Sequence, residues 1–249
     1  MNYLDLFHGI GGFALGAYWA GMKFENHFCS DIEPYTQKLY KLRFPDSVQL
    51  GDITKIDFEK LKNDYPGEWI ITGGFPCQDI SIAGKGAGIE GKRSGLWFEY
   101  WRAISILQPR FAIMENVGAI TFRGLTEVIG SLHEIGYNAE WQDIRASEMG
   151  AQHRRERIWI IAYTKCKRWG QNIIEKSFKK TRNMGKYKFI NSENIKRNKR
   201  EPESKIYRKI DGIPCRVDRL KGLGNSIVPQ IAELLFNLIK PFCNERINK

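Results

Sequence analysis

Short apolar runs and amphipathic stretches alternate along residues 2–163. Runs of five to eight residues, most of them ending at a glycine or an acidic residue, indicate buried strands, whereas apolar positions at helical spacing indicate helices. The runs predict strands at 3–7, 24–31, 47–52, 69–74, 111–116, 138–144 and 157–163. The amphipathic stretches predict helices at 11–21, 33–44, 96–107 and 126–136. This alternation with short connections predicts an α/β fold with a mostly parallel sheet covered on both faces.

The pattern changes after Tyr163. Residues 165–221 are rich in Lys, Arg and Asn, sparse in apolar residues and without a clean period. A helical period resumes at 226–239, and its apolar stripe needs a surface to cover, so we expect this helix to return to the first domain. We therefore predict a catalytic and cofactor-binding domain at 1–164, a small irregular domain at 165–220, and a returning segment at 221–249.

The positive charge of the chain lies in that irregular segment. The formal net charge is +11, yet residues 165–221 hold 19 basic and 6 acidic residues, and the remainder holds 20 and 22. A solvated Lys-rich surface would suffice to explain such a segment. The functional alternative is attraction to a polyanion such as nucleic acid.

The five cysteines show no C-x-x-C spacing, which argues against a zinc site and against a disulfide framework. We expect no metal and a reducing, cytoplasmic setting. No apolar run is long enough to cross a membrane, and the first residues lack the basic start and apolar core of a signal peptide.

Several residues with chemical potential follow predicted strands, where the ligands of such sheets bind. The turn at 7–12 is rich in glycine and lets a ligand approach the backbone. Asp31 stands where a carboxylate can take the hydroxyls of a ribose, and Asp52 could hold an adenine amino group. Both acids could equally be helix caps. Together with the turn they suggest a cofactor that contains adenosine.

Cys77 follows Pro76 at the end of a predicted strand, where a glycine-rich basic loop of the kind that acts as a lid begins. A buried filler thiol is the alternative, but this position favours a nucleophile. Glu115 ends the neighbouring strand, where a dry cleft would raise its pKa and let it donate a proton. Arg155 and Arg157, two apart on a predicted strand, would point to one face. A thiol and an acid of this kind suit addition to C6 of a pyrimidine with protonation at N3.

The chain resembles the cytosine-C5 DNA methyltransferases, which use S-adenosylmethionine. The motifs occur in the order of that family over nearly the whole chain except 165–217. They are DLFHGIGGF (5–13), SDIEPY (30–35), GDIT (51–54), GGFPCQDIS (73–81), RSGLWFE (93–99), MENV (114–117), QHRRERIW (152–159) and LGNSIVPQIA (223–232). The resemblance implies a Rossmann-like fold with a mixed, mostly parallel sheet and a small target-recognition domain.

The resemblance also implies roles for single residues. Cys77 would attack C6, Glu115 would protonate N3, Arg157 and Arg155 would support the bound cytosine, and Asn116 would buttress the Cys77 loop. The implied cofactor pocket consists of Phe7, Gly9, Ile10, Gly11, Asp31, Ile32, Asp52, Ile53, Pro76, Leu96, Asn225 and Ser226. The implied DNA contacts are Gln78, Ser81, Lys85 and Arg93.

By the same resemblance the partner is double-stranded DNA from which the target base is flipped, the product is S-adenosylhomocysteine, and the protein is a monomer. A cognate restriction endonuclease, a prophage setting and an orphan role are all compatible with it. Gln152 and His153 depart from the family, which usually has proline and glutamine before the RRER segment. The Cys-Phe-Thr signature of the related tRNA methyltransferases is not in the sequence. The intact motifs argue against an inactive homologue and against another Rossmann-type enzyme.

Overall fold

The computed structural model describes residues 1–76, 95–151, 154–164 and 226–243. Seven strands form one sheet in this part of the chain: β1 (Asn2–Leu6), β2 (Asn26–Ser30), β3 (Val48–Gln49), β4 (Trp69–Gly73), β5 (Phe111–Val117), β6 (Asn138–Arg145) and β7 (Glu156–Tyr163). Their order is β3-β2-β1-β4-β5-β7-β6, and β7 runs antiparallel to the other six strands. The predicted α/β fold with a mixed, mostly parallel sheet is confirmed.

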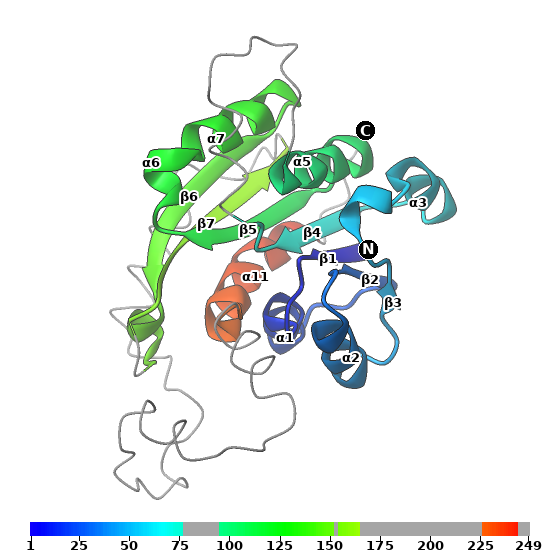
Figure 1. Cartoon of the computed structure of the whole chain (residues 1–249), viewed down its shortest axis with the longest axis horizontal. Coiled ribbons are helices and arrows are strands. Elements are labelled where there is room, and N and C mark those ends of the chain that lie inside the picture. The colour runs from blue at the N-terminus through cyan, green and yellow to red at the C-terminus, as the bar shows by residue number, and fades with distance from the viewer. Residues whose placement is uncertain (77–94, 152–153, 165–225, 244–249) are drawn as a thin grey trace, which may run out of the picture.

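Helices cover both faces of the sheet (Figure 1). The helices are α1 (Gly12–Trp19), α2 (Pro34–Arg43), α3 (Phe58–Asp64), α5 (Leu96–Leu107), α6 (Ile120–Arg123), α7 (Leu125–Glu134) and α11 (Pro229–Cys243), with 3-10 turns η1 (Ile53–Lys55) and η3 (Ala146–Met149). One face carries α1, α2 and α11, and the other carries α3, α5 and α7. No helix within the described ranges is long and apolar enough to cross a membrane.

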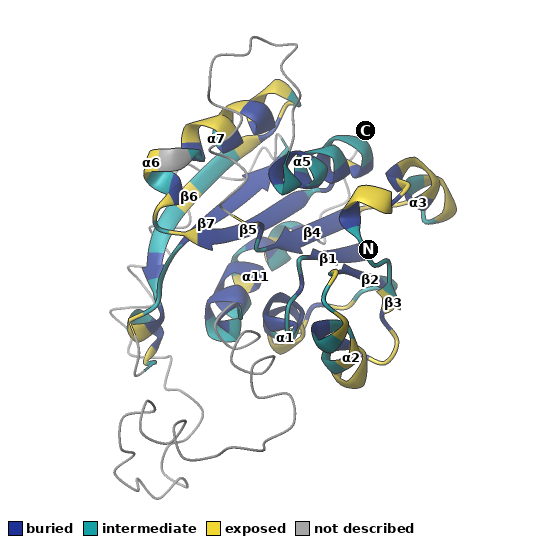
Figure 2. Ribbon diagram, in the orientation of Figure 1, coloured by how far each residue is buried: buried dark blue, intermediate teal, exposed yellow. Residues whose placement is uncertain are grey.

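The alternation of side chains along each strand divides the core into two halves. Tyr3 points toward α1 and α11, and Leu4 points toward α5, so each half packs on its own set of helices. The central strands are buried along their whole length (Figure 2), as expected for a sheet covered on both faces. Two residues of one strand therefore face the same layer only when they are an even number of positions apart.

Helix α11 lies against α1 because two glycines of α1 leave no side chain between them. A Cβ atom on Gly12 would lie 2.5 Å from the carbonyl oxygen of Ile227, and one on Gly16 would lie 2.5 Å from Cβ of Ala232. The segment that leads into α11 is thereby brought next to the glycine turn at the N-terminus of α1, although more than 200 residues of chain separate them. The predicted limits at 164 and 220 adjoin residues outside the described ranges and stay predictions.

The predicted elements differ from the structure mainly at their ends. The helix predicted at 96–107 has the same limits as α5, whereas the strand predicted at 47–52 is reduced to Val48–Gln49. The Leu50 amide still donates to the Cys29 carbonyl of β2 (2.8 Å), but by Asp52 the chain has turned into η1, where the Asp52 carboxylate accepts a hydrogen bond from the Thr54 amide. Helix α3, which the hydrophobic pattern did not predict, begins at an Asp57 cap.

Candidate active site

The strand order reverses between β1 and β4, and the ends of these two strands define the candidate site. In a sheet of this kind a crevice opens beyond the carboxyl ends of the strands at the reversal. β1 leads into the turn at 7–12, and β4 leads through Gly73 and Gly74 toward Cys77. β5, next to β4, brings Glu115 and Asn116 to the same edge.

The glycine turn has an unusual backbone conformation. Phe7 has a φ of 50°, in the left-handed region that side chains other than glycine rarely occupy, and Gly9 and Gly11 also have positive φ. A Cβ atom on Gly11 would lie 2.7 Å from Phe44, whereas Gly9 has no atom within 4 Å of the corresponding position. Gly11 is thus required for packing, while Gly9 leaves the surface of the turn open to a ligand.

Asp31 ties this turn to the end of β2. One carboxylate oxygen accepts a hydrogen bond from the Gly9 amide (2.9 Å), and the other accepts from the Glu33 amide (2.8 Å). The N-cap of α2 is Glu33, so the alternative of Asp31 as a helix cap is wrong. Ile32, which follows it, is 70% exposed, and an apolar side chain so placed offers a flat surface beside the carboxylate.

Asp52 and Ile53 follow β3 and behave differently from each other. The Asp52 carboxylate caps η1, and the amide and hydroxyl of Thr54 hold its pKa below the ordinary value. The expected cap is therefore present, and the carboxylate remains at the surface. Ile53 is only 3% exposed and packs into the core, so it can offer a ligand its backbone but not its side chain.

Arg102 of α5 holds η1 in place. Its guanidinium donates to the carbonyl oxygens of Ile53 (3.2 Å) and Ile56 (3.1 Å) and pairs with Glu99. It also lies over the ring of Phe58, 4.6 Å from the centroid. The helix that begins at Leu96 is thereby fixed to the turn that carries Asp52.

Glu115 forms the centre of the described site. It is 8% exposed, and its carboxylate lies 3.0 Å from Nε of Arg157. Glu115 faces the α1 layer, like the side chains two and four residues before it, and Arg157 of β7 faces the same layer, so the pairing of β5 with β7 brings them together. Burial raises the pKa of Glu115 to about 7, although Arg157 and Arg155 oppose the shift. A carboxyl with this pKa can hold or release a proton near neutral pH.

The two arginines lie differently from the prediction of one strand face. Only Arg157 belongs to β7, because Arg155 precedes Glu156, the first residue of the strand. Arg155 donates a hydrogen bond from Nη2 to the carbonyl of Ser226 (2.7 Å), and desolvation lowers its pKa. It therefore links the segment before α11 to the Glu115 site.

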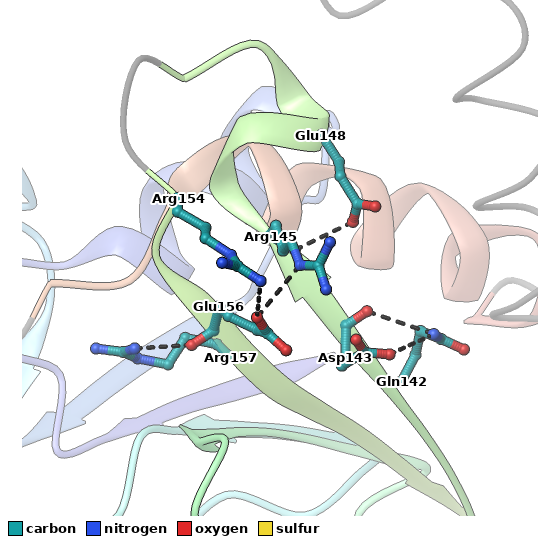
Figure 3. Close-up of polar contacts among 7 residues, drawn as sticks. All are labelled: Gln142, Asp143, Arg145, Glu148, Arg154, Glu156 and Arg157. Carbon is teal, nitrogen blue, oxygen red and sulfur yellow. Dashed lines mark hydrogen bonds and ion pairs between the residues drawn. The ribbon is translucent and has the colours of Figure 1, made fainter.

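Ion pairs on the opposite face fix the start of β7 (Figure 3). The Glu156 carboxylate accepts from Nε of Arg145 at 3.2 Å and lies 3.7 Å from the Arg154 guanidinium. Arg157 points away from this group, and its Nη1 donates to the Glu156 carbonyl (2.8 Å). The Glu156 carboxylate thus pairs with Arg145 and Arg154, and the Arg157 guanidinium pairs with Glu115.

Two further residues shape the Glu115 site. A Cβ atom on Gly74 would lie 3.2 Å from Oε2 of Glu115, so the absence of a side chain at Gly74 leaves space for the carboxylate. Asn116 donates a hydrogen bond from Nδ2 to the carbonyl of Phe75 (2.9 Å), two residues before Cys77. The sequence suggested a role for Asn116 but not for Gly74, although a double glycine directly after an apolar strand was a usable signal.

The structure describes only part of the predicted site. It brings together Glu115, Arg155, Arg157 and Ser226. It places Phe7, Gly9, Ile10, Gly11, Asp31, Ile32, Asp52 and Pro76 in the turns that follow strands, and Leu96 at the first position of α5. Cys77, Gln78, Ser81, Lys85, Arg93 and Asn225 lie outside the described residues, as does all of the predicted lid at 78–95 except Gly95. Among the described residues, His, Cys, Asp and Glu form no group of three suited to a metal ion.

The strand order and the glycine turn after β1 are those of the Rossmann-like class, and β5 adds a buried acid whose pKa lies near neutrality. Comparison with known proteins identifies the family. A family model of C-5 cytosine-specific DNA methylases matches residues 1–214, and the chain belongs to this family.

Similar proteins include type II methyltransferases. M.NgoBV of Neisseria gonorrhoeae is 35% identical over an alignment of 182 residues that covers 67% of this chain and 42% of that protein. M1.ScrFI of Lactococcus lactis subsp. cremoris is 37% identical over an alignment of 164 residues that covers 64% of this chain and 41% of that protein. The chain thus spans less than half the length of these curated relatives.

Among solved structures, the Dnmt2 methyltransferase of S. pombe matches with a TM-score of 0.68 at 15% identity, over 97% of this chain and 99% of that one. This likeness shows the fold alone. A putative DNA modification methyltransferase from an E. coli prophage matches with a TM-score of 0.54 at 29% identity, over 66% and 47% of the chains.

Proposed function

We propose that this chain is a DNA (cytosine-5-)-methyltransferase that transfers the methyl group of S-adenosylmethionine to cytosine in duplex DNA. The observation that carries the proposal is the buried Glu115, which is paired with Arg157 and has its pKa raised to about 7, beside the strand that leads to Cys77. Family membership supports it.

The described residues fit the cofactor. The turn at Gly9 is open, the Asp31 and Asp52 carboxylates lie at adjacent strand ends, and the exposed Ile32 offers an apolar surface for a base. Asp31 would hold the ribose, Asp52 the adenine amino group, and the backbone of the glycine turn the amino-acid end. When bound, the cofactor supplies an electrophilic methyl group.

In the proposed reaction, the Cys77 thiolate adds to C6 of a flipped cytosine, and a proton passes from Glu115 to N3. The electron pair freed at C5 would then take the methyl group, and S-adenosylhomocysteine would leave with the electron pair of the broken sulfur–methyl bond. Solvent water would accept the C5 proton, the C5–H electron pair would form the C5=C6 double bond and expel the Cys77 thiolate, and N3 would return its proton to Glu115. Arg157 would hold the Glu115 carboxyl in place, and Asn116 would fix the backbone before Cys77.

Labelled S-adenosylmethionine and mixed genomic duplex DNA test the proposal, with bisulfite sequencing to locate the methyl groups. We expect transfer to cytosine C5 by the 249-residue chain and none by Cys77→Ala. DNA with 5-fluorocytosine at the target should trap a covalent adduct, because the C5 substituent cannot leave as a proton. Transfer at the wild-type rate by Cys77→Ala, or no transfer by the wild-type chain, would contradict the proposal.

A further inference from the structure

The proposed reaction gives no role to a buried histidine inside the glycine turn. His8 is 3% exposed and lies between Phe7 and Gly9 at the end of β1. We propose that His8 is a positioning residue that fixes the Gly9 peptide, and with it the shape of the cofactor turn, through a hydrogen-bond chain from β2 and β3. The identity of the ligand in this inference rests on the proposed function.

The donors and acceptors along this series of hydrogen bonds determine which nitrogen of His8 carries the proton. The Cys29 thiol donates to Oε1 of Gln49 (2.9 Å), so the amide nitrogen of Gln49 faces Nε2 of His8, also at 2.9 Å. An amide nitrogen only donates, and Nε2 therefore accepts. The proton of the neutral imidazole is then on Nδ1, which donates to the carbonyl of Gly9 at 2.8 Å.

Gly9 is thereby held on both sides. Its amide donates to Asp31 at 2.9 Å, and its carbonyl accepts from His8. Because the peptide between Gly9 and Ile10 is planar and trans, fixing the carbonyl also directs the Ile10 amide to the opposite side, away from His8. Gly9 has a φ of 51°, and no atom lies within 4 Å of the position that a Cβ would take there, so nothing packs on that side of the residue and its hydrogen bonds set its orientation.

The surroundings of His8 keep its ring neutral and in place. The ring packs on Tyr40 with centroids 4.1 Å apart, and the Tyr40 hydroxyl donates to the buried Asp5. Burial lowers the pKa of His8, against an opposing effect of the Asp31 carboxylate. A neutral ring is what the hydrogen bond from Gln49 requires.

Two substitutions separate the Nδ1 donor from the bulk of the side chain. His8→Asn places an amide nitrogen where Nδ1 stands, whereas His8→Leu fills similar space without a donor. We expect His8→Leu to weaken S-adenosylhomocysteine binding about 10-fold or more in calorimetry, since it removes a buried hydrogen bond. His8→Asn should recover most of the affinity, and kcat with saturating cofactor should change less than KM.

Nitrogen NMR of protein with labelled histidine tests the hydrogen bonds of His8 in the absence of a ligand. The His8 signals, assigned by their loss in His8→Asn, should show a protonated Nδ1 and an unprotonated Nε2. Gln49→Leu should weaken this preference, because the Gly9 carbonyl alone then holds the proton on Nδ1. A proton on Nε2 would overturn the inference, and so would equal affinities of the Leu and Asn variants. If the wild-type chain binds no S-adenosylhomocysteine, the proposed function itself fails, whatever the NMR result.

Discussion

Glu115 combines a cost to stability with the proposed role as a proton donor. Its folded-state pKa of about 7 lies above the ordinary 4.5, mainly through desolvation, so ionisation is less favourable in the folded protein than in the unfolded chain. The stabilising difference is fully present below the unfolded pKa and is lost as the pH rises through about 7. A carboxyl that keeps a proton to donate at neutral pH must have a raised pKa, and the loss of stability follows from that raised pKa.

The first prediction concerns the activity of Glu115→Gln. The amide is nearly the same size but has no acidic proton, so we expect single-turnover methyl transfer to fall by roughly 10²-fold or more, with S-adenosylhomocysteine binding retained. Glu127→Gln, an exposed position on α7, is the matched control and should transfer at the wild-type rate. Equal rates for Glu115→Gln and the control would exclude the proposed role of the acid.

The same substitution should stabilise the protein in a defined pH range. From the shift of Glu115 we expect the free energy of unfolding of Glu115→Gln to exceed that of the wild type at pH 8 by on the order of 3 kcal/mol. The advantage should shrink as the pH falls through 7 toward 4.5. Urea denaturation across this range measures it, and a difference that does not vary with pH would show that Glu115 is not perturbed.

Gly74 gives a second prediction at the residue scale. A methyl group there would lie 3.2 Å from Oε2 of Glu115 and must displace the carboxylate by a few tenths of an ångström. We expect Gly74→Ala to lower the transfer rate by about 10²-fold, because reacting groups must lie within a fraction of an ångström of their working positions. Gly118→Ala, which meets no atom within 4 Å, is the control. An unimpaired Gly74→Ala enzyme would contradict the role assigned to Gly74.

At the scale of elements, the pinning of η1 by Arg102 predicts an effect on base discrimination. If Arg102 positions Asp52, Arg102→Met should weaken S-adenosylhomocysteine binding about 10-fold but leave binding of the hypoxanthine analogue, which lacks the amino group, nearly unchanged. The affinity of Arg102→Lys for S-adenosylhomocysteine should lie between those of the wild type and Arg102→Met. A loss of equal size for both ligands, measured by calorimetry, would show that Arg102 only supports the fold.

The sequence predicted elements well where a local signal and the tertiary structure agree. The amphipathic stretch at 96–107 predicted the limits of α5, and the acid after an apolar run correctly placed Glu115 near the end of β5. The sequence could not predict contacts between strands. The contact of Gly74 with Glu115 and the hydrogen bond of His8 with Gln49 depend on how separate strands pair. Arg155 was misplaced since strand limits are set by pairing as well as by pattern.

At the scale of the whole molecule, the residues of the proposed active site and the positive charge lie in different segments. The residues outside 165–221 carry nearly balanced charge, so they offer duplex DNA little long-range attraction. Residues 165–221, with 19 basic and 6 acidic side chains, are the part of the chain suited to neutralising phosphates. We therefore expect the salt dependence of DNA binding to originate there.

Two triple variants with the same change in net charge test this division. Replacing Lys179, Lys180 and Lys186 by Gln should reduce the slope of log K against log salt by up to about 3, since each phosphate contact contributes about 0.9. Replacing the exposed Lys23, Lys38 and Lys60 removes as much charge from the described part and should leave the slope unchanged. Fluorescence anisotropy from about 50 to 200 mM salt measures both slopes. Equal reductions of the two slopes would mean that net charge alone, rather than its location in 165–221, determines the salt dependence of DNA binding.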